Sequence, residues 1–202
     1  RRAKVVVIGG GVAGEHAARN AVGLGADVTV IDLSLPRLRQ LEASFGTTIQ
    51  TRHSSRLEIA DQVADADLVI GSVLVPGAAA PKLVTDDMVA AMRPGSVLVD
   101  IAIDQGGCFE GSRPTTHAEP VFAVHDALYS CVANIPGAVP ETSTRALTNA
   151  TLPYVLRIAD LGWEDAARAD AALARGVNVH AGAITNQGVA AALGVDAVPA
   201  LA

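Results

Sequence analysis

The chain has 202 residues, of which 50% are hydrophobic and 18% charged, with a formal net charge of −6. This composition excludes intrinsic disorder, because disordered chains combine few apolar residues with high net charge. It also argues against a nucleic-acid surface, which needs basic clusters or stacking aromatics, because only 3% of the residues are aromatic. No apolar run reaches the roughly 18 residues of a membrane span, and no signal peptide is recognisable. We therefore expect one globular domain, or one domain with an appendage.

The chain holds two cysteines, Cys108 and Cys131. They have no metal-ligand spacing, and two cysteines in a chain of this size do not form a disulfide framework, so a reducing, cytoplasmic location is expected. The chain starts at Arg1 rather than at a methionine and enters a strand almost at once. We therefore expect it to be a piece of a longer protein.

Apolar, β-branched runs alternate with helix-compatible stretches. Strands are expected at residues 3–8, 27–31, 47–51, 68–71, 97–103, 121–124 and 128–133. Helices are expected at residues 12–24, 36–45, 57–64 and 85–92. The polar strand 47–51 is predicted to lie near a sheet edge, and Thr85 is predicted to cap the helix that follows it. The alternation predicts an α/β fold with a doubly wound, mostly parallel Rossmann sheet.

The composition shifts after Pro140. From Arg145 onward the sequence is rich in alanine, has a helical pattern interrupted by glycines, and shows no further buried strand. We expect a first domain at residues 1–140 and a C-terminal helical segment at residues 141–202 that has no sheet of its own and packs on something other than the first domain's sheet.

A glycine-rich turn follows the first strand and opens the first helix. It reads Gly9-Gly10-Gly11-Val12-Ala13-Gly14, which is a G-x-G-x-x-G motif. Gly9 permits the tight turn, Gly11 lets the backbone approach a pyrophosphate, and Gly14 lets the helix pack close to the strand. The helix N-terminus then offers free N–H groups and a favourable dipole to the anion. The motif is weak alone, but its strand–turn–helix context predicts a dinucleotide site.

An acidic residue, Asp32, ends the second strand 18 positions after Gly14. A carboxylate there accepts the ribose hydroxyls of adenosine and repels a 2′-phosphate, which favours NAD over NADP. Arg37, one helical turn further on, offers three possibilities: it offsets part of that repulsion, it is solvated, or it lies across the adenine.

Two other nucleotide-binding classes share the glycine turn. Flavin disulfide reductases have a similar entry segment, but they need a redox cysteine pair at short spacing, and Cys108 and Cys131 stand 23 positions apart. Methyltransferases also combine a glycine turn with an acidic strand end. Their glycine pattern usually differs, and no signature of their pocket is present.

Two later loops carry polar side chains where an open α/β sheet places its ligands. Asp104 stands before Gly106 and Gly107, and strand alternation predicts that Asp100 and Asp104 point the same way, with Asp104 at the strand tip. An aspartate there hydrogen-bonds a substrate or moves a proton, unless it merely initiates a turn. Asn134 offers an amide suited to a nicotinamide carboxamide, unless its loop is only a linker into the helical tail.

The remaining titratable groups are interpreted as structural. The histidines have no triad or metal-ligand spacing, so no metal site is predicted; they are His16, His53, His117, His125 and His180. Lys82 is expected to be a surface lysine, and Cys131 a small core residue.

At these residues the chain resembles the carboxyl-terminal part of bacterial L-alanine dehydrogenase. The matching segments are VVVIGGGVAGEHAA, ADLVIGSVLVPGAAAPKLVT, MRPGSVLVDIAIDQGGCFE, CVANIPGAVPETST and ALTNATLPYVLRIAD. The segments VDIAIDQGGC and VANIPGAVP are more specific than the glycine motif. The alpha subunit of proton-translocating transhydrogenase is also similar, but it carries a different loop where IDQGG stands here.

The resemblance implies reversible oxidative deamination of L-alanine to pyruvate and ammonium, with hydride transfer to NAD. It implies that Asp104 is the active-site aspartate. It also implies a dinucleotide site made of Gly9, Gly11, Val12, Ala13, Gly14, Asp32, Arg37, Ser54, Val73, Leu74, Leu83, Ile101, Asp104, Asn134 and Ile135. One departure is Ile135, where the family commonly has methionine.

The family also has an amino-terminal substrate domain with the catalytic histidine and the lysine and arginine that hold the substrate carboxylate. That domain is absent from this sequence. We therefore expect residues 141–202 to pack on it, and the chain alone to bind NAD without turning over alanine. The resemblance further implies a homohexamer, and the composition leads us to expect no nucleic-acid or membrane partner. The alternative is an NAD-binding module of a transhydrogenase alpha subunit.

Overall fold

The computed structural model describes residues 1–75 and 80–200. Among these residues the chain forms two compact units, which are described separately. The first unit comprises residues 1–75 and 80–135, and the second comprises residues 136–200.

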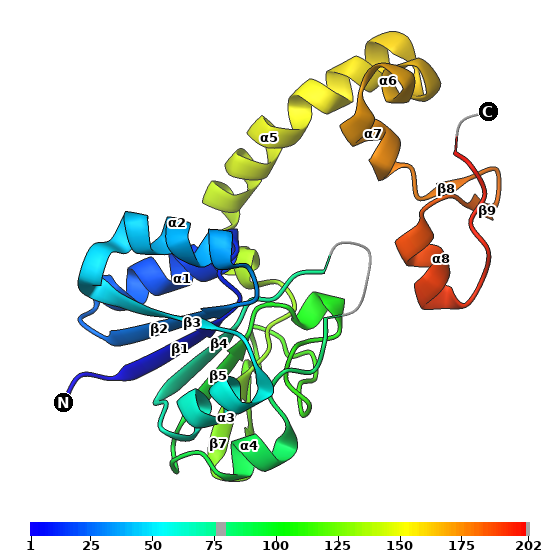
Figure 1. Cartoon of the computed structure of the whole chain (residues 1–202). Helices are drawn as coiled ribbons and strands as arrows, with labels where there is room; N and C mark the ends of the chain where they lie inside the picture. The colour runs from blue at the N-terminus through cyan, green and yellow to red at the C-terminus, as the bar shows by residue number, and fades with distance from the viewer. Residues whose placement is uncertain (76–79, 201–202) are drawn as a thin grey trace. The chain divides into compact units, whose positions relative to one another are not determined.

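The first unit is built on a seven-stranded sheet (Figure 1). Its strands are β1 (Lys4–Ile8), β2 (Asp27–Asp32), β3 (Ile49–His53), β4 (Leu68–Gly71), β5 (Val97–Asp100), β6 (Val121–Val124) and β7 (Ala127–Ser130). Their order in the sheet is β3-β2-β1-β4-β5-β7-β6, and every pair is parallel except β6–β7. The strand order reverses beside β1, and open α/β sheets bind their ligands at the carboxyl ends of the strands at such a reversal.

Two apolar cores cover the two faces of this sheet, because successive residues of each strand point to opposite faces. Val5 and Val7 of β1 pack with the helices of one face, whereas Val6 and Ile8 pack with those of the other. Helices α1 (Val12–Gly23) and α2 (Leu35–Phe45) contribute to the first core. Helices α3 (Arg56–Ala64) and α4 (Asp86–Ala90) contribute to the second core. The predicted doubly wound, mostly parallel Rossmann sheet is thus confirmed.

Several predicted boundaries differ from the structure. The polar strand β3 lies at the sheet edge, as predicted, but begins two residues later, after the 3₁₀ helix η1 (Gly46–Thr48). Thr85 occupies the N-cap position of α4, but its side chain makes no capping hydrogen bond. The first N–H of α4, that of Asp86, instead donates to the carboxylate of Glu110, 24 positions away.

The prediction of a strand at residues 97–103 was wrong at its end. Strand β5 stops at Asp100, and residues Ile103–Gln105 form the 3₁₀ helix η2. The apolar pattern continues to Ile103, but the buried carboxylate of Asp100 accepts the N–H of Ala102, which turns the chain out of the sheet.

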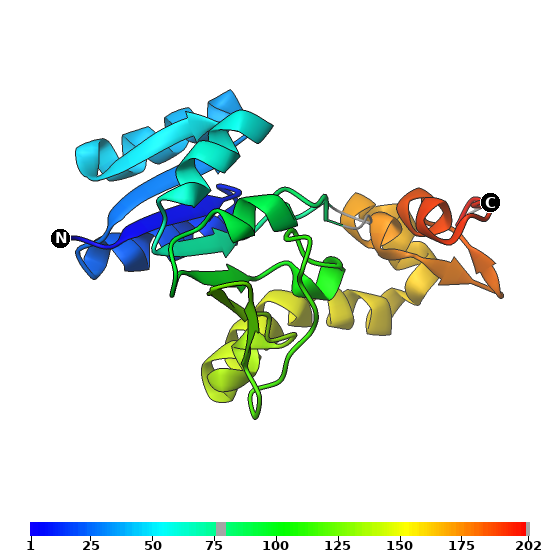
Figure 2. The same ribbon diagram turned by 90° about the horizontal axis from the view of Figure 1, so that it is seen from below.

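The second unit begins within η3 (Ile135–Ala138) and is mainly helical. Its helices are α5 (Pro140–Leu161), α6 (Trp163–Ala169), α7 (Ala171–Gly176) and α8 (Gln187–Leu193). The expectation that this region has no sheet was wrong, because β8 (Val179–His180) and β9 (Ala183–Ile184) form an antiparallel ribbon. Gly182, with φ of +80°, lies in the ribbon's turn, and α8 packs beside the ribbon (Figure 2).

No helix within residues 1–75 and 80–200 is long and apolar enough to cross a membrane. The longest of them, α5, has no buried residue among its 22 positions.

Candidate functional site

The carboxyl edge of the sheet gathers residues from the ends of five neighbouring strands, β3, β2, β1, β4 and β5. Backbone hydrogen bonds of 2.8–2.9 Å continue the sheet past the strand ends, from Ser54 N to Asp32 O, Gly9 N to Ile31 O, Ser72 N to Ile8 O, and Ile101 N to Gly71 O. Four of the residues predicted to line the dinucleotide site, namely Gly9, Asp32, Ser54 and Ile101, therefore lie along one edge.

The glycine turn between β1 and α1 is tightly packed against β4. Gly9 has φ of +99°, and a Cβ there would lie 2.8 Å from the carbonyl oxygen of Ser72. A Cβ on Gly14 would lie 1.8 Å from the carbonyl oxygen of Gly9. These two glycines are therefore required by the close approach of the turn, the helix and the neighbouring strand.

Gly11 differs from the other two motif glycines, because a Cβ on it would meet no atom within 4 Å. Gly11 is the N-cap of α1, has no side chain that caps the helix, and is exposed together with Val12 and Ala13. An open helix N-terminus of this kind accommodates a diphosphate, since its N–H groups and dipole favour anions. The turn thus fits the pyrophosphate of a dinucleotide.

The carboxylate of Asp32 fixes the turn from the end of β2. Its Oδ2 accepts the N–H of Gly10 at 2.7 Å, and its Oδ1 accepts the N–H of Ser34 at 2.7 Å. Each oxygen has a second lone pair, so the carboxylate keeps acceptor capacity for sugar hydroxyls. Asp32 is thus held in place by two backbone N–H groups and can still accept hydrogen bonds from the two hydroxyls of a ribose.

Arg37 contacts this turn through its guanidinium group. Its Nε donates to the carbonyl oxygen of Gly10 at 2.6 Å, and its guanidinium pairs with the carboxylate of Glu15. The hydrogen bond from Arg37 lowers the pKa of Glu15, and Arg19 lowers it further. Of the three possibilities for Arg37, the solvated one is wrong, because the guanidinium is partly buried and its charge is paired with a neighbouring carboxylate.

Asp104 lies on η2, between β5 and the glycines Gly106 and Gly107, which have φ of +90° and +72°. Its side chain is exposed. The prediction that Asp100 and Asp104 point the same way by strand alternation was wrong, because the strand ends at Asp100. Asp104 is carried on a separate turn beyond the sheet.

Asp100 was not predicted as an organising residue, yet it is fully buried. Its carboxylate accepts the N–H groups of Ala102, Cys108 and Phe109 and the hydroxyl of Ser112. A buried carboxylate needs such partners to offset its desolvation. The sequence signal that could have identified it is an aspartate inside an apolar strand. Burial of such a carboxylate costs free energy unless hydrogen bonds compensate for it.

The other predicted lining residues differ in their exposure. Val73, Leu83 and Ile101 are half-buried, whereas Leu74, Asn134 and Ile135 are exposed. The carbonyl oxygen of Asn134 lies 2.7 Å from Nε2 of His117. Residues 76–79 of the similar segment PGAAAPK lie outside the described residues.

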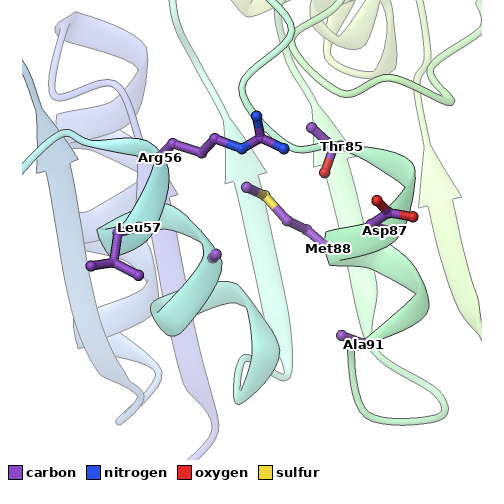
Figure 3. A pocket seen from close by; sticks show the side chains of 7 residues that line it. Arg56, Leu57, Thr85, Asp87, Met88 and Ala91 are labelled. Atoms are coloured by element: carbon purple, nitrogen blue, oxygen red, sulfur yellow. The ribbon is translucent and has the colours of Figure 1, made fainter.

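A separate pocket of about 540 Å³ lies between α3 and α4 (Figure 3). It is lined by Arg56, Leu57, Ala60, Thr85, Asp87, Met88 and Ala91. None of the predicted site residues lines this pocket. The hydroxyl of Thr85 is buried there without a hydrogen-bond partner among the described residues.

Comparisons with known proteins agree with this fold. The alanine dehydrogenase of Mycolicibacterium smegmatis is 62% identical over 188 residues, which cover 93% of this chain and 51% of that protein. An L-alanine dehydrogenase structure superimposes with a TM-score of 0.84 at 48% identity, covering 95% of this chain and 53% of that one. A transhydrogenase structure from Sinorhizobium meliloti gives a TM-score of 0.62 at 35% identity, covering 70% of this chain and 40% of that one.

The chain therefore spans about half the length of the alanine dehydrogenases it matches. Residues 1–187 match the family described as "Alanine dehydrogenase/PNT, C-terminal domain". The chain belongs to this family.

Proposed function

We propose that this chain is the NAD-binding part of an L-alanine dehydrogenase, which interconverts L-alanine with pyruvate and ammonium. The observation that carries the proposal is the pairing of an open helix N-terminus at Gly11 with the carboxylate of Asp32 on the adjacent strand. The first fits a diphosphate and the second fits the adenosine ribose.

The charges around Asp32 favour NAD over NADP. A 2′-phosphate beside Asp32 would place like charges about 4 Å apart, which costs about 4 kcal/mol per unit charge at an effective dielectric of about 20. Arg37 is the nearby cation that would offset this cost, but it is already paired with Glu15 and with the Gly10 carbonyl. Arg37 is therefore already engaged and is less available to receive a phosphate.

Asp104 and Asn134 are proposed to act at the nicotinamide end. When bound, NAD supplies the hydride acceptor for the Cα of alanine. Asp104 stands on an exposed turn, where it can accept or return a proton as water adds to the imine and the carbinolamine collapses. The Asn134 amide is suited to the carboxamide of the nicotinamide, and the placement of its backbone near His117 helps to position it.

The substrate carboxylate is proposed to bind in the half of the protein that lies outside this chain. The second unit supports this assignment, because α5 exposes apolar side chains along its length, namely Leu147, Leu152, Val155, Leu156 and Leu161. We propose that residues 141–202 pack on the substrate domain. Amide exchange across α5 should then be slower in the whole protein than in this chain.

The transhydrogenase module is the weaker alternative, because the similarity to that structure is lower in identity, coverage and TM-score. The homohexamer and the cytoplasmic location remain predictions. The latter is supported by two thiols that are both free.

The decisive experiment is calorimetric titration of the chain with NADH and NADPH. We expect saturable binding of NADH and at least tenfold weaker binding of NADPH, with a smaller difference in Asp32→Asn. The absence of heat with NADH, or tighter binding of NADPH, would contradict the proposal. The chain alone should produce no NADH from NAD and L-alanine, whereas the whole protein should do so.

A further inference from the structure

Residues 80–84 lie along residues 105–109 and satisfy each carbonyl group of that segment. Backbone N–H groups supply three of the hydrogen bonds, from Ala80 to Gln105 and from Leu83 and Val84 to Cys108. The remaining three carbonyl oxygens, those of Gly106, Gly107 and Phe109, have a single side chain as their partner. That side chain is Lys82.

The ammonium of Lys82 donates to these three oxygens at 2.6, 2.9 and 3.1 Å. An ammonium group has three N–H donors, so the three carbonyl groups use its full hydrogen-bonding capacity. Lys82 is exposed, as predicted, but its charged end is bound to the protein rather than left to solvent. The convergence of three carbonyl oxygens on one cation also relieves the repulsion between their dipoles.

Asp104 lies between two such anchors. On its amino-terminal side, Asp100 accepts the N–H of Ala102, and on its carboxyl-terminal side, Lys82 holds Gly106. Backbone hydrogen bonds within the segment, from Gly106 to Ile103 and from Gly107 to Ala102, close the turn itself. Gly106 and Gly107 have left-handed backbone conformations and no side chains, so Lys82 is the side chain that ties their carbonyl groups to the segment at residues 80–84.

We propose that Lys82 is a positioning residue, which fixes the turn bearing Asp104 at the nicotinamide end of the dinucleotide site. The inference rests on the proposed function of Asp104. It predicts that loss of the Lys82 ammonium makes the nicotinamide end of the dinucleotide site less ordered. The adenosine end of the site, formed by the glycine turn and Asp32, should keep its structure.

The test compares two ligands in the 202-residue chain. NADH engages both ends of the site, whereas ADP-ribose lacks the nicotinamide ring. We expect Lys82→Met to weaken the binding of NADH about tenfold and to leave the affinity for ADP-ribose within about twofold of the wild-type value. Amide exchange over residues 102–110 should accelerate, while exchange over residues 27–53 should not. Lys82→Arg keeps the charge and several donors, so it should recover part of the NADH affinity.

Arg2→Met is the charge-matched control, because Arg2 is exposed and precedes β1, at the opposite end of that strand from the site. It should leave both affinities unchanged. If Lys82→Met fails to fold, Lys82→Gln, which is neutral but keeps two donors, replaces it in the comparison with Lys82→Arg. Unchanged NADH binding, or an equal loss of NADH and ADP-ribose, would overturn the inference. Failure of wild type to bind NADH would instead overturn the proposed function.

Discussion

The hydroxyl of Ser72 donates to the carbonyl oxygen of Gly9 at 2.7 Å and lies 3.1 Å from that of Ile8. Ser72 directly follows β4, and Gly9 follows β1, so this contact ties the glycine turn to the next strand of the sheet. Both residues are buried. The shape of the turn therefore depends on a side chain 63 positions away from it.

Replacement of this hydroxyl should cost both stability and affinity. We expect Ser72→Ala to reduce the free energy of unfolding by about 1–3 kcal/mol, because it leaves a buried carbonyl group without its partner, and to weaken NADH binding. Urea denaturation and calorimetry measure the two effects. The control is Ser55→Ala, which removes the N-cap hydroxyl of α3. It should cost about 0.5–2 kcal/mol but leave NADH affinity unchanged. Equal effects of the two variants on NADH affinity would contradict this assignment.

Gly11 and Gly14 should respond in opposite ways to the same substitution. Gly14→Ala should severely destabilise the first unit, because the new Cβ would lie 1.8 Å from the Gly9 carbonyl oxygen. Gly11→Ala meets open space, so its cost should stay below about 1 kcal/mol, the scale of an N-cap change. Its Cβ would instead obstruct the pyrophosphate and reduce NADH affinity. Thermal unfolding and NADH titration of both variants test this, and a stable Gly14→Ala that binds NADH normally would refute it.

The pair formed by Glu15 and Arg37 should make stability depend on pH in the acid range. Arg37 lowers the pKa of Glu15 below its ordinary value of 4.5. As the pH falls, Glu15 is therefore protonated in the unfolded chain before it is protonated in the folded chain. The contribution of the Glu15–Arg37 pair to the free energy of unfolding is thus present above pH 4.5 and is lost as the pH falls through the lower pKa of Glu15 in the folded state. Glu15→Gln should be less stable than wild type at pH 7, and the difference should shrink below pH 4.5. Urea midpoints measured across this range provide the check, and a difference independent of pH would speak against the pair.

The two thiols should be unreactive in the folded protein. Burial raises the pKa of Cys108, and the Asp100 carboxylate raises it further; burial also raises the pKa of Cys131. Because the thiolate is the reactive form, a thiol reagent at pH 8 should label neither residue until urea unfolds the chain. Above the ordinary pKa of 9.0, the unfolded chain loses these protons first, so stability should decline as the pH rises. Rapid labelling of native Cys108 would show that it is accessible.

The sequence alone determined the parts of the candidate site that are local in the chain. Gly9, Gly11, Gly14 and Asp32 fall within a single strand–turn–helix–strand unit, in which hydrophobic periodicity and glycine placement define the geometry directly. The same periodicity was sufficient for the parallel sheet. It failed at residues 101–103, where the apolar pattern continued after the strand had ended.

Only the tertiary structure decided how the site is held in shape. Ser72 reaches the glycine turn, Lys82 reaches the Asp104 loop, and Glu15 pairs with Arg37, across 63, 24 and 22 positions respectively. The position of a single serine, lysine or glutamate in the sequence does not indicate which distant residue it will bind. Hydrogen-bond partners are set by which loops the strand order brings to the same sheet edge, and that order emerges only when the whole chain has packed.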